Sequence, residues 1–165
     1  MKKRVKYTAK SYFWPILSVL AVGAVAWSRY QRHGDMFYFW LFAGLLALMV
    51  ILMLFFSPVS VSVTDGGVIL KSLLGSKTIP FDKIVKVKEF IPSATAKSPF
   101  GSRDWLGTWG WFKDNRIGRY RAFYGNPDEC FLVTLSDGKM FLIGCDDHAA
   151  VMDAIREKCN LTQNR

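Results

Sequence analysis

Two long apolar runs lie close together near the start of the chain, at residues 12–28 and 36–56, and neither contains a charged residue. A short polar stretch at residues 28–35 (SRYQRHGD) connects them. A helix rises about 1.5 Å per residue, so roughly 20 apolar residues cross the hydrocarbon core of a bilayer. The second run has this length. The first approaches it, and aromatic residues mark both of its edges, where they favour the headgroup region. The pattern predicts a transmembrane helical hairpin over residues 12–56.

A cleaved secretory signal is the alternative interpretation of the first run. A basic segment precedes the run, and Ala-Val-Ala at residues 24–26 resembles a cleavage site. However, this site directly abuts Trp27, and the remaining chain would open with Arg29 and Arg32 ahead of another span. We therefore expect the first run to be retained as a membrane helix.

Lysine and arginine residues are distributed unevenly around the two runs. Five of them lie within residues 1–11, ahead of the first run, and two lie in the connection between the runs. Because basic residues accumulate on the cytoplasmic side of a membrane, both termini are expected in the cytoplasm. The three cysteines, Cys130, Cys145 and Cys159, lack the spacing of a zinc site and fit unreactive thiols in a reducing compartment.

The chain changes character after Ser57-Pro58, where about 100 residues remain, enough for one small domain. Valine alternates with serine or threonine over residues 59–64, which is typical of a half-buried strand. Further strands are expected at residues 68–73, 76–79, 84–89, 118–124, 130–135 and 140–144. The last element is expected to be a helix near residues 147–158, with one apolar stripe.

About seven antiparallel strands followed by a single C-terminal helix is the order of a pleckstrin-homology-like (PH-like) barrel. Short motifs occur in the matching order: Gly-Trp-Phe at 110–112, Gly-Arg-Tyr at 118–120, Asp-Gly-Lys at 137–139 and an acidic cap at 146–147. In these features the chain resembles the bacterial PH-domain families of membrane-anchored proteins. The resemblance implies a PH-like domain at residues 57–159 with a tail at 160–165, held at the bacterial inner membrane by the hairpin. Residues 145–148 depart from the family, which more often has Ser-Pro there.

Residues 90–117 form a long connection for a compact domain, and such loops are often functional. Between Lys97 and Arg121 there are six basic and two acidic residues, interleaved with aromatic ones. Aromatic rings favour the headgroup zone, and each basic side chain near an anionic leaflet contributes about 1 kcal/mol. The candidate lipid- or partner-binding residues are Trp105, Trp109, Trp111, Phe112, Lys113, Arg116, Arg119 and Arg121.

Two other interpretations fit the same residues. In the first, the tryptophans fold back over the barrel, and the arginines of the strand at 118–124 form an ordinary solvated face. In the second, the surface binds a neighbouring membrane protein or a second copy of the chain, because Trp, Tyr and Arg also dominate protein interfaces.

No catalytic, metal or cofactor site is expected. The two histidines, His33 and His148, lie far apart in the chain, and no nucleophile–base pair is suggested. Much of the net charge of +9 flanks the apolar runs, where membrane topology explains it without nucleic acid. We predict a non-catalytic binding or scaffolding module at the membrane that contacts anionic lipid headgroups or a neighbouring membrane protein. The alternative is an accessory or self-assembling subunit of a membrane complex.

Overall fold

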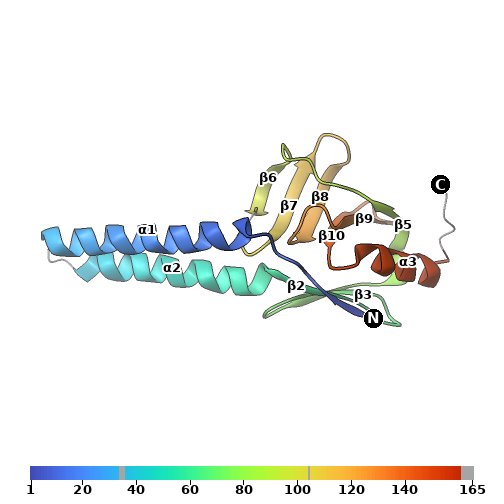
Figure 1. Ribbon diagram of the computed structural model, residues 1–165, viewed down its shortest axis with the longest axis horizontal. Coiled ribbons are helices and arrows are strands. Elements are labelled where there is room, and N and C mark those ends of the chain that lie inside the picture. The colour runs from blue at the N-terminus through green and yellow to red at the C-terminus, as the bar shows by residue number, and fades with distance from the viewer. Residues whose placement is uncertain (34–35, 104, 161–165) are drawn as a thin grey trace.

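The computed structural model describes residues 1–33, 36–103 and 105–160. Two long helices, α1 (Lys10–His33) and α2 (Met36–Phe56), extend side by side from a domain of β-strands and one further helix (Figure 1). Helix α2 has the predicted bounds. Helix α1 continues through residues 28–33, because this polar stretch contains no glycine or proline to end it. The polar connection expected at 28–35 is therefore helical over residues 28–33, and residues 34–35 lie outside the described residues.

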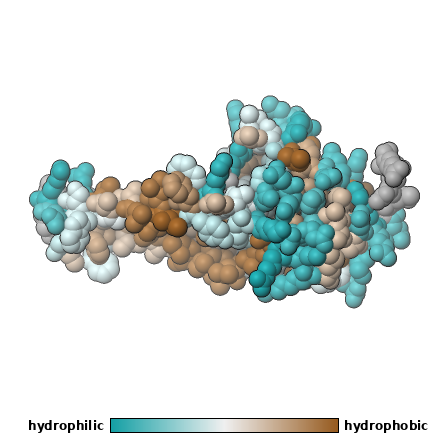
Figure 2. All heavy atoms as spheres, viewed as in Figure 1, coloured by the Kyte–Doolittle hydropathy of each residue, from teal (hydrophilic) through white to brown (hydrophobic). Residues whose placement is uncertain are grey.

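The apolar side chains of both helices face outward. In the most apolar stretch of each helix, only 11% of α1 and 6% of α2 is buried. Figure 2 shows this apolar surface over the middle of the hairpin, between a hydrophilic tip and the largely hydrophilic domain. The core helix of a soluble protein would bury such a face. Both helices are thus long, apolar and exposed enough to cross a membrane.

The first sheet contains β1 (Lys2–Arg4), β2 (Pro58–Val63), β3 (Val68–Ser72) and β4 (Ser76–Ile79) in that order, with antiparallel neighbours. Strand β1 comes from the N-terminal basic segment and pairs with β2. The whole helical hairpin separates these two strands in the sequence. The amino group of Met1 donates to the carbonyl of Val63 at 2.8 Å, which extends this pairing. The first residues therefore belong to the sheet domain and lie at the same end of the hairpin as the rest of it (Figure 1).

Two ion pairs attach the N-terminal segment to the start of α3 (His148–Lys158). The ammonium of Lys3 lies 2.8 Å from a carboxylate oxygen of Asp147, and that of Lys6 lies 2.7 Å from Asp146. Asp147 occupies the N-cap position of α3, but its side chain makes no capping hydrogen bond. The two acidic residues expected to cap the helix instead form ion pairs that join the N-terminal segment to the start of α3.

The second sheet has the order β5-β9-β10-β8-β7-β6. A short 3-10 helix, η1 (Phe81–Lys83), leads into it from the first sheet. Its strands are β5 (Ile84–Glu89), β6 (Lys97–Ser102), β7 (Thr108–Asp114), β8 (Gly118–Tyr124), β9 (Cys130–Leu135) and β10 (Met140–Gly144). Strands β8 and β10 are parallel, so the expectation of a wholly antiparallel sheet is wrong at this one pair. The PH-like architecture of two sheets and a C-terminal helix is confirmed.

Residues 90–117 are not one long loop, because strands β6 and β7 form a hairpin within them. Aromatic residues on both faces of β7 hide the alternation that would announce a strand. The hairpin requires glycine at position 110, where φ is 109° and a Cβ would lie 2.5 Å from the Cα of Gly101 on the paired strand. Two glycines thus let the strands approach closely.

The core lies between the two sheets. Strands β9 and β10 contribute large buried side chains to it, and β2 and β3 cover them with valine and leucine. Helix α3 adds Val151, Met152 and Ile155, as its apolar stripe predicts. Cys130 and Cys145 are buried and unpaired, and burial raises the pKa of each thiol. The sheets consequently form a rigid support for side chains on the second sheet.

Candidate functional site

One face of β7 and β8 gathers aromatic and basic side chains. Because side chains alternate along a strand and directly paired residues share a face, the register defines its members. Trp111 pairs with Arg121, and Lys113 pairs with Arg119. Trp109 lies two residues before Trp111 and shares its side of the sheet. We call these five residues, Trp109, Trp111, Lys113, Arg119 and Arg121, the basic–aromatic face. All five are among the residues predicted from the sequence.

The opposite face of the same strands is closed. Phe112 and Tyr120 are fully buried, and their rings stack with centroids 6.0 Å apart. They belong to a second apolar cluster with Leu132 and Leu142 from the neighbouring strands. Phe112 was a predicted contact residue, but its burial removes it from any surface. The even-numbered residues of β7, such as Phe112, face the interior, and the odd-numbered ones face outward. The sequence alone did not reveal which of the two sets is buried.

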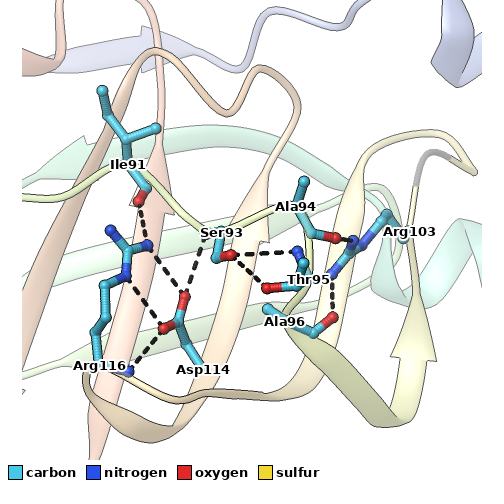
Figure 3. Close-up of polar contacts among 8 residues, drawn as sticks. All are labelled: Ile91, Ser93, Ala94, Thr95, Ala96, Arg103, Asp114 and Arg116. Carbon is cyan, nitrogen blue, oxygen red and sulfur yellow. Dashed lines mark hydrogen bonds and ion pairs between the residues drawn. The ribbon is translucent and has the colours of Figure 1, made fainter.

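Arg116 is another predicted contact residue, and its guanidinium is engaged within the protein (Figure 3). Its Nη2 donates to Asp114 at 3.1 Å and to the carbonyl of Ile91 at 2.9 Å. The Asp114 side chain is only 2% exposed, and the hydrogen bond from Arg116 lowers its pKa to about 2. Arg103 likewise donates to the carbonyls of Ala94 and Ala96. Both arginines hold the segment at 91–96 against the closed face.

The turn between β6 and β7 contacts α1, and the start of β7 contacts α2. Trp109 stacks on Phe56, the last residue of α2, with centroids 5.0 Å apart and an interplanar angle of 17°. The amide of Leu106 donates to the carbonyl of Ser11 at the start of α1. Trp105 lies half-buried in this turn. The basic–aromatic face therefore begins where the apolar helices end, and strands β6 and β7 rise beside that end of α1 (Figure 1).

A cleft of about 220 Å³ opens between the two sheets beside the face. Its lining includes Phe56, Lys77, Trp109, Arg121 and Phe141. The ammonium of Lys77 lies 4.6 Å from the ring centroid of Phe141. Burial lowers the pKa of Lys77, and the nearby Arg121 lowers it further. The cleft thus brings together two cations from different sheets.

Lys77 was missed by the sequence prediction, although a signal was present. Lys77 pairs directly with Leu70, a core residue, and lies two positions before the buried Ile79. This parity places the Lys77 side chain on the inner side of its strand. A lysine at an inward position of a predicted strand is therefore the pattern to look for.

The cations of the face and cleft differ from Arg116 in having no acidic partner. Among the described residues, Lys77, Lys113, Arg119 and Arg121 take part in no ion pair. The same part of the chain contains no group of three His, Cys, Asp or Glu residues placed to hold a metal ion. Such an arrangement suits the binding of an anion, because guanidinium and ammonium groups can only donate hydrogen bonds.

Comparison with protein families agrees with this architecture. The family model described as the bacterial PH domain matches residues 59–159, from β2 to the end of α3. PH domains are generally non-catalytic binding modules. No significant match came from the curated proteins or from the solved structures. The match covers more than half of the chain, and the protein belongs to the bacterial PH domain family.

Proposed function

We propose that this protein is a membrane-anchored, non-catalytic PH-like module that binds anionic phospholipid headgroups of the bacterial inner membrane through its basic–aromatic face. In this proposal α1 and α2 span the membrane and the sheet domain lies in the cytoplasm. The observation that carries the proposal is a set of unpaired cations on a rigid sheet, starting at the ends of two exposed apolar helices.

Electrostatics supports this ligand. Each Lys or Arg near an anionic leaflet contributes about 1 kcal/mol, and this attraction fades within a Debye length of roughly 10 Å. The stack of Trp109 on Phe56 holds one end of the face at the end of α2, and Arg121 lies opposite Trp111, two residues further along the strand. Arg121 is therefore the cation of the face that lies nearest to the helix end. Unpaired cations are available for lipid phosphates without first breaking an internal ion pair.

Exposed aromatic rings on the same hairpin add a second source of membrane affinity. Phe100 on β6 is 67% exposed and pairs directly with Trp111, which is 39% exposed. Aromatic side chains favour the headgroup region of a bilayer. Phe100 was absent from the residues predicted from the sequence, and we add it to the proposed contact surface.

Binding of a protein partner, or self-assembly, uses the same surface in the alternative proposal. It draws less support, because Trp105 is half-buried and Trp109 stacks on Phe56, which leaves Trp111 as the exposed tryptophan of the three. This alternative predicts binding that is insensitive to salt and lost in Trp111→Ala.

The test uses the full chain in nanodiscs made of equal parts phosphatidylcholine and phosphatidylglycerol. Electron paramagnetic resonance measures how strongly the protein immobilises spin-labelled phosphatidylglycerol relative to spin-labelled phosphatidylcholine. We expect a preference for phosphatidylglycerol that weakens at high salt. The double variant Lys113→Glu/Arg119→Glu should reduce the preference at least about fivefold, because two attractive charges become repulsive.

The matched control is Lys83→Glu/Lys86→Glu, which makes the same charge change at exposed lysines near the opposite edge of the sheet. This control should leave most of the preference intact. An equal loss in both double variants, or no loss in either, would contradict a headgroup contact at the basic–aromatic face.

A further inference from the structure

We infer that the cleft between the two sheets is a binding site for the phosphate group of one phospholipid, with Lys77 and Arg121 as its charged contacts. This inference rests on the proposed function and names a particular site within it. The surface contact involves many lipids in exchange, whereas the cleft holds a single headgroup at fixed donors.

The charges in the cleft are arranged as an anion site. Lys77 and Arg121 come from β4 and β8, in different sheets, and both line the same cavity. Like charges held together raise the free energy of the folded protein unless an anion lies between them. The nearby carboxylate of Asp137 already binds Lys139 at 2.7 Å, and neither cation of the cleft has an ion-pair partner within the described residues.

The side chain of Trp109 forms part of the wall of the cleft. The indole N–H of Trp109 is buried and has no hydrogen-bond partner among the described residues. Buried tryptophan N–H groups usually find a partner, and an exception calls for an explanation such as a ligand.

The position of the cleft selects a lipid rather than a free anion as the source of the phosphate. Phe55 and Phe56, the last residues of α2, form part of its lining. An apolar helix of this length ends where the hydrocarbon core gives way to headgroups. The cavity of about 220 Å³ is smaller than the roughly 300–1,000 Å³ of pockets that bury whole small molecules, so it suits one headgroup phosphate.

The test measures lipid binding by native mass spectrometry of the full chain in detergent. The probes are dioleoyl-phosphatidylglycerol and dioleoylglycerol, which has the same acyl chains and no phosphate. We expect one tightly bound phosphatidylglycerol and at least about tenfold weaker binding of dioleoylglycerol. Lys77→Gln and Arg121→Gln should each weaken phosphatidylglycerol binding about tenfold, and Lys77→Arg should retain it.

The control Lys86→Gln removes an exposed cation from β5 of the same sheet but outside the cleft and outside the basic–aromatic face, and should leave the single tight site intact. Lys77→Gln should unfold at the same urea concentration as the native chain or at a higher one, because it removes a positive charge that lies close to Arg121. If Lys77→Gln unfolds at a lower urea concentration than the native chain, the effect on phosphatidylglycerol binding is judged from Arg121→Gln instead.

Three results would overturn the inference. The first is unchanged phosphatidylglycerol binding in Lys77→Gln and Arg121→Gln. If Lys113→Glu/Arg119→Glu still loses its lipid preference in nanodiscs, the proposed function survives and only the cleft fails. If that double variant is also unchanged, both fail. The second is equal binding of dioleoylglycerol. The third is displacement of phosphatidylglycerol by inorganic phosphate at equal concentration, which would make the cleft a free-anion site.

Discussion

The two faces of strands β7 and β8 have similar residues, but one face is buried against the protein and the other is exposed. Both combine aromatic rings with arginines that belong to these strands or to their turns. On the closed face, Arg103 and Arg116 donate to backbone carbonyls, and Arg116 also pairs with a buried carboxylate. On the basic–aromatic face, Arg119 and Arg121 form no ion pair within the described residues. The difference lies in the partners that the fold supplies, since the residue types are alike.

This contrast indicates how to separate structural from functional charges in a basic segment. An arginine that satisfies carbonyls and a carboxylate stabilises the protein, and its loss leaves buried groups without partners. An arginine without partners contributes little to stability and is free to bind a ligand. Stability measurements on matched pairs of residues can therefore test the division between the two faces.

The largest difference in stability is expected between alanine substitutions of two neighbouring aromatic residues, Phe112 and Trp111, which lie on opposite faces. Phe112→Ala should lower the free energy of unfolding by about 3–5 kcal/mol, because it opens a cavity in the second apolar cluster. Trp111→Ala should lower it by less than about 1 kcal/mol, since this side chain is partly exposed. Urea unfolding of the full chain in detergent, followed by near-ultraviolet circular dichroism, measures both. Similar losses for the two variants would break the distinction between the faces.

A smaller effect is expected from the arginines. Arg116→Ala should cost about 2 kcal/mol, because the buried carboxylate of Asp114 keeps only the backbone amides of Ser93 and residue 116 as donors. Arg119→Ala should change stability by no more than about 0.5 kcal/mol, as is usual for an exposed residue without partners. The same unfolding experiment compares them. A large loss for Arg119→Ala would give this arginine a structural role that we do not expect.

The smallest effect is a dependence on pH. The pKa of Asp114 is lowered from 3.8 to about 2 by its hydrogen bond with Arg116. A lowered pKa stabilises the folded state above the unfolded pKa and loses this contribution as the pH falls through the folded one. The stability gap between the native chain and Arg116→Gln should therefore narrow by about 1 kcal/mol between pH 4 and pH 2, after allowance for the half-exposed guanidinium.

Acid unfolding is measured for the native chain and for Arg116→Gln. Other carboxylates titrate in both proteins, so the difference between the two reports on Asp114. A gap that stays constant across this range would mean that Arg116 does not set the pKa of Asp114. Asp114→Asn provides a further check, because it removes the titrating group and should flatten the pH dependence in the same range.

Much of the fold could be predicted from local patterns. The helix at 36–56 follows from its unbroken apolar run, and the strands at 118–124, 130–135 and 140–144 have the predicted bounds. The β6–β7 hairpin was missed, because β6 contains proline and glycine and β7 has aromatic residues on both faces. Strand β1 was missed because three basic residues give no apolar alternation.

For the site, the sequence determined that aromatic and basic residues concentrate between Lys97 and Arg121, because composition is a property of the segment itself. Only the tertiary structure decided which of these charges remain free. Arg116 finds its acceptor at Ile91, 25 positions away in the sequence, and Lys3 finds Asp147 across 144 positions. Lys77 and Arg121 meet because two sheets pack together. Partners of buried polar groups are selected by packing over long separations, and no local pattern records that selection.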